Sequence, residues 1–278
     1  MKNDVFRTQK LSLNKGVKMK VLILGGTADG RKMAAALTEL GVPVIYSVAG
    51  LVRRPALDCE ILVGGFSALG GLSAFCQARN VQLILDITHP FAAQMSNTAV
   101  QAANGLDIPC WRFHRLDWPK HQDDDWHEFR DWAALLIQAQ CYQRVFVSAG
   151  RISQEDLNSL SRACQLVVLR TAVKPDLELA DNVVWIHAIG PFTFSDERDL
   201  FQQYQIDCLI SKNSGGAATY AKLVAAREAQ IPVLMHQRPV LAKANQQFTE
   251  PAACIYAVQA WLSEHLSTPS SKQEASDA

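Results

Sequence analysis

The stretch VLILGGTADGRKMAAAL, residues 21–37, joins a short apolar run to a pair of glycines and then to residues with helical spacing. Four apolar residues that end at Gly25 and Gly26 are typical of a buried parallel strand. Met33 and Leu37 then recur at the spacing of one helix face. The stretch therefore predicts a strand, a tight turn and a helix.

Such a turn places the first N–H groups of a helix over the end of a strand, which favours an anion such as a phosphate. The dinucleotide-binding fingerprint has glycine at its first, third and sixth positions. Gly25 and Gly30 fit the first and sixth, whereas Thr27 occupies the third. Two interpretations stay open at this point, a phosphate site and a glycine-rich turn without a ligand.

The composition is that of a globular protein with a sizeable core. The 278 residues are 49% hydrophobic and 19% charged, which is enough for about two domains. Lysine plus arginine equals aspartate plus glutamate at 27 each, which argues against nucleic acid or an anionic membrane as the main partner. Seven scattered cysteines without a CxxC pair indicate buried thiols in a reducing cytoplasm. We expect neither a signal peptide nor a membrane span.

Apolar runs alternate with helical patterns along most of the chain, which predicts an α/β protein with mainly parallel sheets. A tryptophan-rich segment at residues 111–132 interrupts the alternation and indicates a domain junction. We predict a loose extension at 1–18, a nucleotide-binding α/β domain at 19–115, a second α/β domain at 116–266 and a disordered tail at 267–278.

The second predicted strand runs into SVAGLVRRP, residues 47–55, with no acidic residue before Asp58. An acid at this place holds the ribose hydroxyls of NAD, whereas small polar residues and arginine accept the extra phosphate of NADP. Ser47, Arg53 and Arg54 are therefore candidates for an adenosine phosphate. The alternative is that both arginines are solvated loop residues.

Thr88 and His89 follow a strand that carries Asp86 near its end, and Pro90 suits the first turn of the next helix. A histidine at this place can donate to a phosphate or a nicotinamide, or act as an acid, because its pKa lies near neutrality. We favour a binding role. The alternative is a helix cap beside a packed histidine.

In the second half, Lys212, Asn213 and Ser214 follow a strand and precede two glycines and a helix. A cation, an amide and a hydroxyl over a helix start predict a site for an anion or a carbonyl group. Arg151, after another strand, is a candidate partner for a substrate carboxylate. The histidine and cysteine spacings match no metal motif, and no nucleophile elbow or P-loop occurs, so we predict no metal.

The segments GGTADGR, SVAGLVRRP, VGGF, DITHPFA, SAGR, GPF and KNSGGAATYAKLVAAREAQIPV occur together in this order between residues 19 and 239. This set resembles the precorrin-6A reductase family of cobalamin biosynthesis, including its cobalt-precorrin-6A variant. The resemblance implies two Rossmann-like domains with a reduced nicotinamide cofactor in a cleft between them. It also implies hydride transfer to a ring double bond of a tetrapyrrole, precorrin-6A or its cobalt form, to give the 6B product.

The resemblance also implies residue roles. The cofactor would contact Gly25, Gly26, Thr27, Asp29, Ser47, Arg53, Gly64, Gly65, Phe66, Thr88, His89 and Pro90. The substrate would contact Arg151, Lys212, Asn213, Ser214, Gly215 and Gly216.

Other roles remain open under this resemblance. The catalytic residue stays undecided among Lys212, Asn213, Ser214 and His89. Arginines such as Arg112, Arg115 and Arg151 would offset the carboxylates of the substrate. Leu51 stands where many members carry arginine, so NADPH is expected and NADH stays an alternative.

Two rival functions fit parts of the pattern. One is another NAD(P)-dependent reductase or epimerase of a small substrate. Such enzymes commonly place a tyrosine and a lysine four apart on one helix, whereas Tyr220 and Lys222 are two apart and lie on different faces. The other is a non-catalytic protein that senses NADPH.

Overall fold

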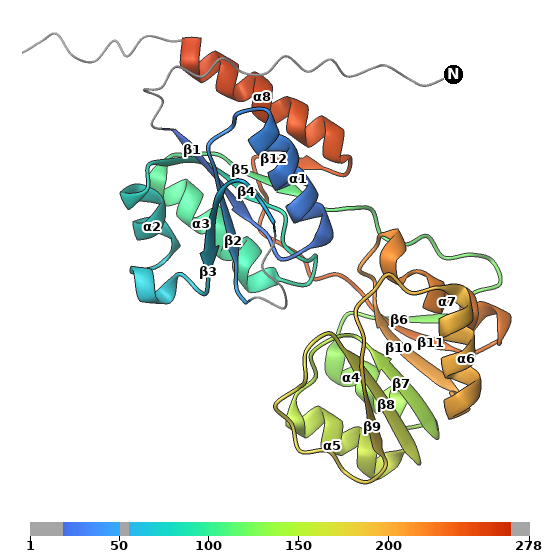
Figure 1. Cartoon of the computed structure of the whole chain (residues 1–278). Helices are drawn as coiled ribbons and strands as arrows, with labels where there is room; N and C mark the ends of the chain where they lie inside the picture. The colour runs from blue at the N-terminus through green and yellow to red at the C-terminus, as the bar shows by residue number, and fades with distance from the viewer. Residues whose placement is uncertain (1–18, 51–55, 268–278) are drawn as a thin grey trace, which may run out of the picture. The chain divides into compact units, whose positions relative to one another are not determined.

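The computed structural model describes residues 19–50 and 56–267 and divides the chain into two compact units (Figure 1). Unit 1 contains the chain up to Arg115 and again from Leu241, and unit 2 spans Leu116–Val240. The predicted extension at 1–18 and residues 268–278 of the predicted tail lie outside the described residues.

Unit 1 is built on six parallel strands in the order β12-β5-β4-β1-β2-β3. The strands are β1 Lys20–Leu24, β2 Val44–Val48, β3 Glu60–Val63, β4 Val81–Asp86, β5 Cys110–Phe113 and β12 Gln246–Phe248. The helices are α1 Ala28–Glu39, α2 Leu72–Ala78, α3 Ala93–Leu106 and α8 Pro251–Ser267, with a short 3-10 turn, η1 Ser67–Leu69.

Unit 2 is built on six further parallel strands in the order β6-β11-β10-β7-β8-β9. The strands are β6 Trp126–Phe129, β7 Arg144–Ser148, β8 Leu166–Thr171, β9 Val183–His187, β10 Cys208–Lys212 and β11 Val233–His236. The helices are α4 Trp132–Ala139, α5 Gln154–Ala163, α6 Phe194–Tyr204 and α7 Ala221–Glu228, with a short 3-10 turn, η2 Ala217–Thr219.

Both sheets follow the strand order 3-2-1-4-5-6 of dinucleotide-binding folds. In unit 1 the sixth place is taken by β12, which comes after the whole of unit 2 in the sequence. In unit 2 the sixth place is taken by β6, which comes before the other five strands. The predicted α/β class with two Rossmann-like domains and mainly parallel sheets is confirmed, and the cofactor cleft between them stays a prediction.

One part of the predicted domain division needs correction. Residues 241–266 were assigned to the second domain, but the structure places them in unit 1. The reason is that β12 pairs with β5, and Cys254, Val258 and Leu262 of α8 are buried in the core of unit 1.

In unit 1 the side chains of each strand alternate between two cores, one on each face of the sheet. Val21 and Ile23 of β1 face the core that contains α1 and α8, whereas Leu22 and Leu24 face the core that contains α2 and α3 (Figure 1). A strand buried on both faces has a continuous apolar sequence, which explains the run at the start of the chain.

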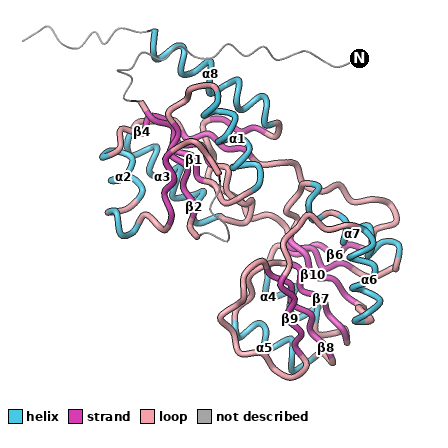
Figure 2. Tube along the Cα trace, in the orientation of Figure 1, coloured by secondary structure: helices cyan, strands magenta, loops and turns pink. Residues whose placement is uncertain are grey.

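Unit 2 repeats this arrangement, with helices on both faces of its strands (Figure 2). Helices α4 and α5 contribute to the core on one face, and α6 and α7 contribute to the core on the other. Trp118 and Trp126 of the tryptophan-rich segment are buried in this second core. All seven cysteines are free thiols, but the prediction that they are buried is wrong for two of them, since Cys59 is half-buried and Cys141 is exposed.

Candidate functional site

The strand order of unit 1 reverses between β1 and β4, whose following helices α1 and α3 belong to opposite faces. In open parallel sheets ligands bind at the carboxyl ends of the strands at such a switch point. The two segments that follow these strands are Gly25 to Thr27 and Ile87 to Pro90. Sequence reasoning singled out both, and the structure brings them together.

Three glycines shape the turn between β1 and α1, each for a different reason. A Cβ on Gly25 would lie 2.3 Å from the ring of Tyr46, which is fully buried. Gly26 has φ of +100°, and a Cβ there would meet nothing within 4 Å. A Cβ on Gly30 would lie 3.2 Å from the Thr27 hydroxyl oxygen. The turn is thus packed from behind and open in front at Gly26.

Hydrogen bonds fix this turn to the rest of the sheet edge. The Thr27 hydroxyl accepts from the Gly30 N–H at 2.9 Å as the N-cap of α1 and donates to the Ile87 carbonyl at 2.9 Å. The Gly26 N–H donates to the Tyr46 hydroxyl oxygen at 3.1 Å. Burial raises the pKa of Tyr46, so this residue stays a neutral phenol.

The end of β4 is held by a buried ion pair. Asp86 is fully buried and accepts from the Thr88 hydroxyl at 2.7 Å and from Arg112 Nε at 2.9 Å. Arg112 also donates to the carbonyls of Ala242 and Ser96. The prediction that Arg112 offsets substrate charge is therefore wrong, because its guanidinium is buried and engaged within unit 1.

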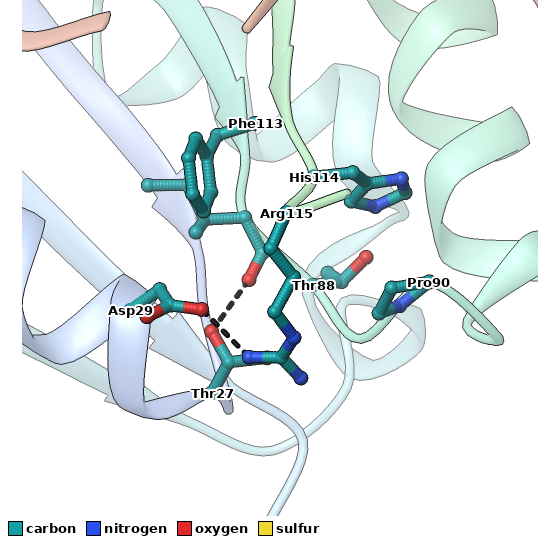
Figure 3. A pocket seen from close by; sticks show the side chains of 8 residues that line it. Thr27, Asp29, Thr88, Pro90, Phe113, His114 and Arg115 are labelled. Atoms are coloured by element: carbon teal, nitrogen blue, oxygen red, sulfur yellow. Dashed lines mark hydrogen bonds and ion pairs between the residues drawn. The ribbon is translucent and has the colours of Figure 1, made fainter. Parts of the chain in front are cut away.

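A pocket opens where these segments meet (Figure 3). Its lining residues are Thr27, Asp29, Ile87, Thr88, Pro90, Phe113, His114 and Arg115. The Asp29 carboxylate accepts from Arg115 Nη1 at 2.6 Å, so Asp29 orients the Arg115 side chain beside the turn (Figure 3). Thr27, Asp29, Thr88 and Pro90 were predicted cofactor contacts, and they share this one pocket.

The lining residues Phe113, His114 and Arg115 were not predicted as cofactor contacts. Phe113 ends β5, and His114 and Arg115 follow it; β5 is the neighbour of β4 on the side away from β1. The sequence did carry a signal for these residues: IPCWRF, residues 108–113, is a largely apolar run typical of a strand, and the carboxyl ends of parallel strands meet at one edge of the sheet. Tyr46 was also missed, since a tyrosine inside an apolar strand looks like a core residue.

Other predicted cofactor residues lie elsewhere in unit 1. Ser47 is inside β2 and 5% exposed, and its carbonyl accepts from the Gly25 N–H. Gly64 and Gly65 follow the edge strand β3, and Phe66 packs in the core against Phe75.

Two further predicted residues need separate mention. His89 follows β4 directly after Thr88, and its Nδ1 accepts from the Phe91 N–H at 3.3 Å. Arg53, with Leu51 and Arg54, lies outside the described residues.

Unit 2 has a switch point of its own between β7 and β10. Arg151 follows β7 and is exposed, and Lys212 ends β10 with its Nζ 5.8 Å from the centre of the Trp132 ring. Burial lowers the pKa of Lys212, which makes its ammonium group a better acid than that of an exposed lysine. Two of the predicted substrate contacts thus lie at the edge of the sheet where ligands bind.

The rest of the predicted second-domain motif is partly structural. Asn213 is 7% exposed, and its side-chain oxygen accepts from the Trp118 N–H at 2.9 Å. The Trp118 indole N–H donates to the Gly216 carbonyl at 2.8 Å. Gly215 and Gly216 have φ of +67° and +79°, which explains glycine at both positions. Ser214 donates to the Lys212 carbonyl at 3.3 Å.

Among residues 19–50 and 56–267, no group of three or more His, Cys, Asp or Glu side chains could hold a metal ion. None of the helices in those ranges combines the length and the apolar character that crossing a membrane requires.

Comparison with known proteins agrees with this geometry. A sequence model of the family described as precorrin-6x reductase CbiJ/CobK matches residues 20–259. The chain belongs to this reductase family. It is 37% identical over 246 residues to the precorrin-6A reductase of Rhodococcus erythropolis, which covers 87% of this chain and 97% of that protein.

Other members of the CbiJ/CobK family are also similar. A solved structure named CobK precorrin-6A reductase matches with a TM-score of 0.77 and 32% identity, covering 90% of this chain and 99% of that one. The cobalt-precorrin-6A reductase of Priestia megaterium is 25% identical over 234 residues, 79% of this chain and 90% of that protein. The chain is therefore an oxidoreductase of cobalamin biosynthesis, and its family implies a nicotinamide cofactor.

Proposed function

We propose that this chain reduces a ring double bond of precorrin-6A to give precorrin-6B, with NADPH as the hydride donor, in the cytoplasm. The observation that carries the proposal is the glycine turn at the switch point of unit 1, in a chain 37% identical to a precorrin-6A reductase. The pocket beside this turn measures only about 10 Å³, room for one water molecule, so it marks the sheet edge where the cofactor would lie and does not enclose the cofactor.

The residues of the turn fit the pyrophosphate of a dinucleotide. In the first turn of α1, the N–H groups of Ala28 and Asp29 have no carbonyl four residues earlier in the helix to bind, and the helix dipole favours an anion there. The open space in front of Gly26 lets a phosphate approach the backbone. Asp29 holds the Arg115 guanidinium beside the turn in an ion pair, which offers N–H donors near the pocket without adding net charge to it.

The preference for NADPH over NADH is the finer part of the proposal. It rests on Arg53 and on the lack of an acid between residues 47 and 57, which removes the usual ribose partner of NAD. Leu51 in place of arginine weakens the preference, so a residual reaction with NADH is expected. Ser47 is buried in β2, so it supports the preference for NADPH less strongly than Arg53 does.

A bound nicotinamide supplies the hydride, and solvent or a side chain supplies one proton to the conjugated ring. Hydride addition to an extended conjugated system spreads the resulting charge over the ring, so the protein need not stabilise a localised charge. The residues of this chain mainly align the two ligands and exclude side reactions. Lys212 and His89 are the proposed proton donors. Asn213 has no acidic proton, and its side-chain oxygen is engaged by Trp118.

The proposed substrate is the metal-free tetrapyrrole. The relative named for the metal-free compound is 37% identical, whereas the relative named for the cobalt compound is 25% identical. Arg151 is exposed at the end of β7 and makes no hydrogen bond or ion pair with any described residue, which suits contact with a substrate carboxylate.

Anaerobic assays of cofactor oxidation test the proposal. The protein is mixed with NADPH or NADH and then with precorrin-6A or cobalt-precorrin-6A, and absorbance of the reduced cofactor is followed. We expect the fastest oxidation with NADPH and precorrin-6A. Tight NADPH binding without oxidation by either tetrapyrrole would instead favour a sensor, and oxidation only by an unrelated small carbonyl compound would favour another reductase.

A further inference from the structure

The hydroxyl of Ser148, the last residue of β7, receives hydrogen bonds from two buried cations. Lys222 Nζ lies 3.1 Å from Ser148 Oγ and 3.4 Å from the Ser148 carbonyl oxygen. Arg170 Nη2 lies 3.4 Å from the same Oγ. Lys222 is 3% exposed and Arg170 is 7% exposed, so water does not replace either contact readily.

Arg170 is fixed in this position from several sides. Its Nη1 and Nη2 bind the two carboxylate oxygens of Glu197 at 3.0 Å and 2.8 Å, and Glu197 is fully buried. The guanidinium also lies over the Phe192 ring, 3.8 Å from its centre. A doubly bonded and stacked arginine has little freedom to turn away from Ser148.

These contacts determine the direction of the Ser148 hydroxyl proton. A serine hydroxyl has one donor and two acceptor sites, whereas arginine and a charged lysine can only donate. Lys222 and Arg170 therefore occupy both acceptor sites of Oγ. The O–H must point away from them, and in the described part of the chain it donates to no protein atom.

We propose that Ser148 is an oriented hydrogen-bond donor to a carboxylate of the tetrapyrrole substrate, with Lys222 and Arg170 as positioning residues. This inference rests on the proposed function. Ser148 is partly exposed and lies at the carboxyl end of β7, beside β10, where ligands of a parallel sheet bind. It also precedes Arg151 by three residues, so both donors lie at the carboxyl end of the same strand.

The charge balance around Ser148 favours an anion. The groups that face Lys222 are Arg170 from β8 and Glu197 from α6, which gives two cations to one carboxylate when Lys222 is protonated. An uncompensated buried cation is costly, and a carboxylate held by Ser148 reduces that cost. A neutral acceptor such as an amide oxygen gains less from this environment.

The same arrangement makes substrate binding depend on pH. Burial and the Arg170 charge lower the pKa of Lys222 to about 7, while Glu197 acts in the opposite direction. Once Lys222 loses its proton, its amine can accept from the Ser148 hydroxyl, which turns that hydroxyl inward. Affinity for the substrate should therefore fall as the pH rises through neutrality.

Steady-state kinetics of Ser148→Ala and Ser148→Thr test the proposal, with Ser161→Ala on α5 as the matched control. Because a hydrogen bond to a charged group is lost, Ser148→Ala should raise the KM for precorrin-6A about tenfold or more while kcat and the Kd for NADPH stay near the wild-type values. Ser148→Thr keeps a hydroxyl and should retain most of the affinity. Thermal unfolding of each variant checks that the fold is intact.

Lys222→Met removes the titrating amine and is compared with Lys174→Met, a change at an exposed lysine. Between about pH 6 and about pH 8.5 the wild-type KM should rise, whereas that of Lys222→Met should stay high and flat. An unchanged KM in Ser148→Ala, a loss in kcat alone, or a wild-type pH dependence in Ser148→Ala would each overturn the proposal.

The wild-type assay separates this inference from the proposed function. If the wild-type protein reduces precorrin-6A and Ser148→Ala does so with the same KM, only the role of Ser148 is refuted. If the wild-type protein neither binds nor reduces precorrin-6A, the proposed function and the role of Ser148 are both refuted.

Discussion

Substitutions at the two adjacent glycines of the β1–α1 turn should have different effects on stability and on cofactor binding. Gly26→Val places a side chain in the open space in front of the turn, because nothing lies within 4 Å of a Cβ there. Because φ of Gly26 is +100°, the expected loss in unfolding free energy comes only from backbone strain, about 1–3 kcal/mol. The side chain occupies the approach of a phosphate, so the Kd for NADPH should rise at least tenfold, about 1.4 kcal/mol.

Gly25→Ala tests the back of the same turn. Its Cβ would lie 2.3 Å from the ring of Tyr46, well inside the ordinary contact distance of about 3.5–4.0 Å. Tyr46 is fully buried and its hydroxyl accepts from the Gly26 N–H, so the ring yields only with backbone movement. The expected cost in unfolding free energy is about 1–3 kcal/mol or more from overpacking.

Urea unfolding and fluorescence titration with NADPH measure the two effects separately. Gly105→Ala in α3 is the control, since a Cβ there also meets nothing within 4 Å but lies within a helix. That change should leave the Kd unchanged and stabilise the helix by about 0.5–1 kcal/mol. A Gly26→Val protein that is folded and binds NADPH with wild-type affinity would refute the assignment of the phosphate site.

Three other changes test separate parts of the structure. Arg53→Ala should raise the Kd for NADPH more than that for NADH, and equal losses in a titration would remove Arg53 from the phosphate site. Arg112→Met leaves Asp86 as a buried charge without its partner and should lower the unfolding free energy by about 3–5 kcal/mol; urea unfolding at wild-type stability would contradict the buried ion pair. Folding lowers the pKa of Lys222 to about 7. Above that pH the unfolded chain binds more protons at this group than the folded chain, so the free energy of unfolding rises with pH, by at most about 1.4 kcal/mol per pH unit. Lys222→Met should lack this rise between about pH 7 and pH 8, and identical pH dependence in urea unfolding would refute the shift.

The sequence predicts the edge of the unit 1 sheet well, because two local patterns coincide there. Apolar runs buried on both faces locate β1 and β4, and the small and polar residues that follow them mark the carboxyl ends. Thr27 and Thr88 were predicted on this basis, and they line one pocket. The family resemblance extends the same argument to the second unit.

Contacts between residues far apart in the sequence could not be predicted from local patterns. No local pattern shows that residues 246–248 pair with β5 of unit 1, because β5 precedes the whole of unit 2 in the sequence. Arg112 looks like a surface cation until its partner Asp86, 26 positions away, is found beside it in the core. The position of Lys222 next to Ser148 and Arg170 could not be predicted for the same reason, because these two residues come from strands distant in the sequence.

Transfer of deuterium from the cofactor to the tetrapyrrole tests the central claim most directly. NADPH labelled with deuterium at either face of nicotinamide C4 is incubated with the protein and precorrin-6A under anaerobic conditions, and the product is examined by mass spectrometry. A direct hydride transfer predicts one deuterium in precorrin-6B from one of the two labelled cofactors and none from the other. A product that carries no deuterium from either labelled cofactor would contradict the account.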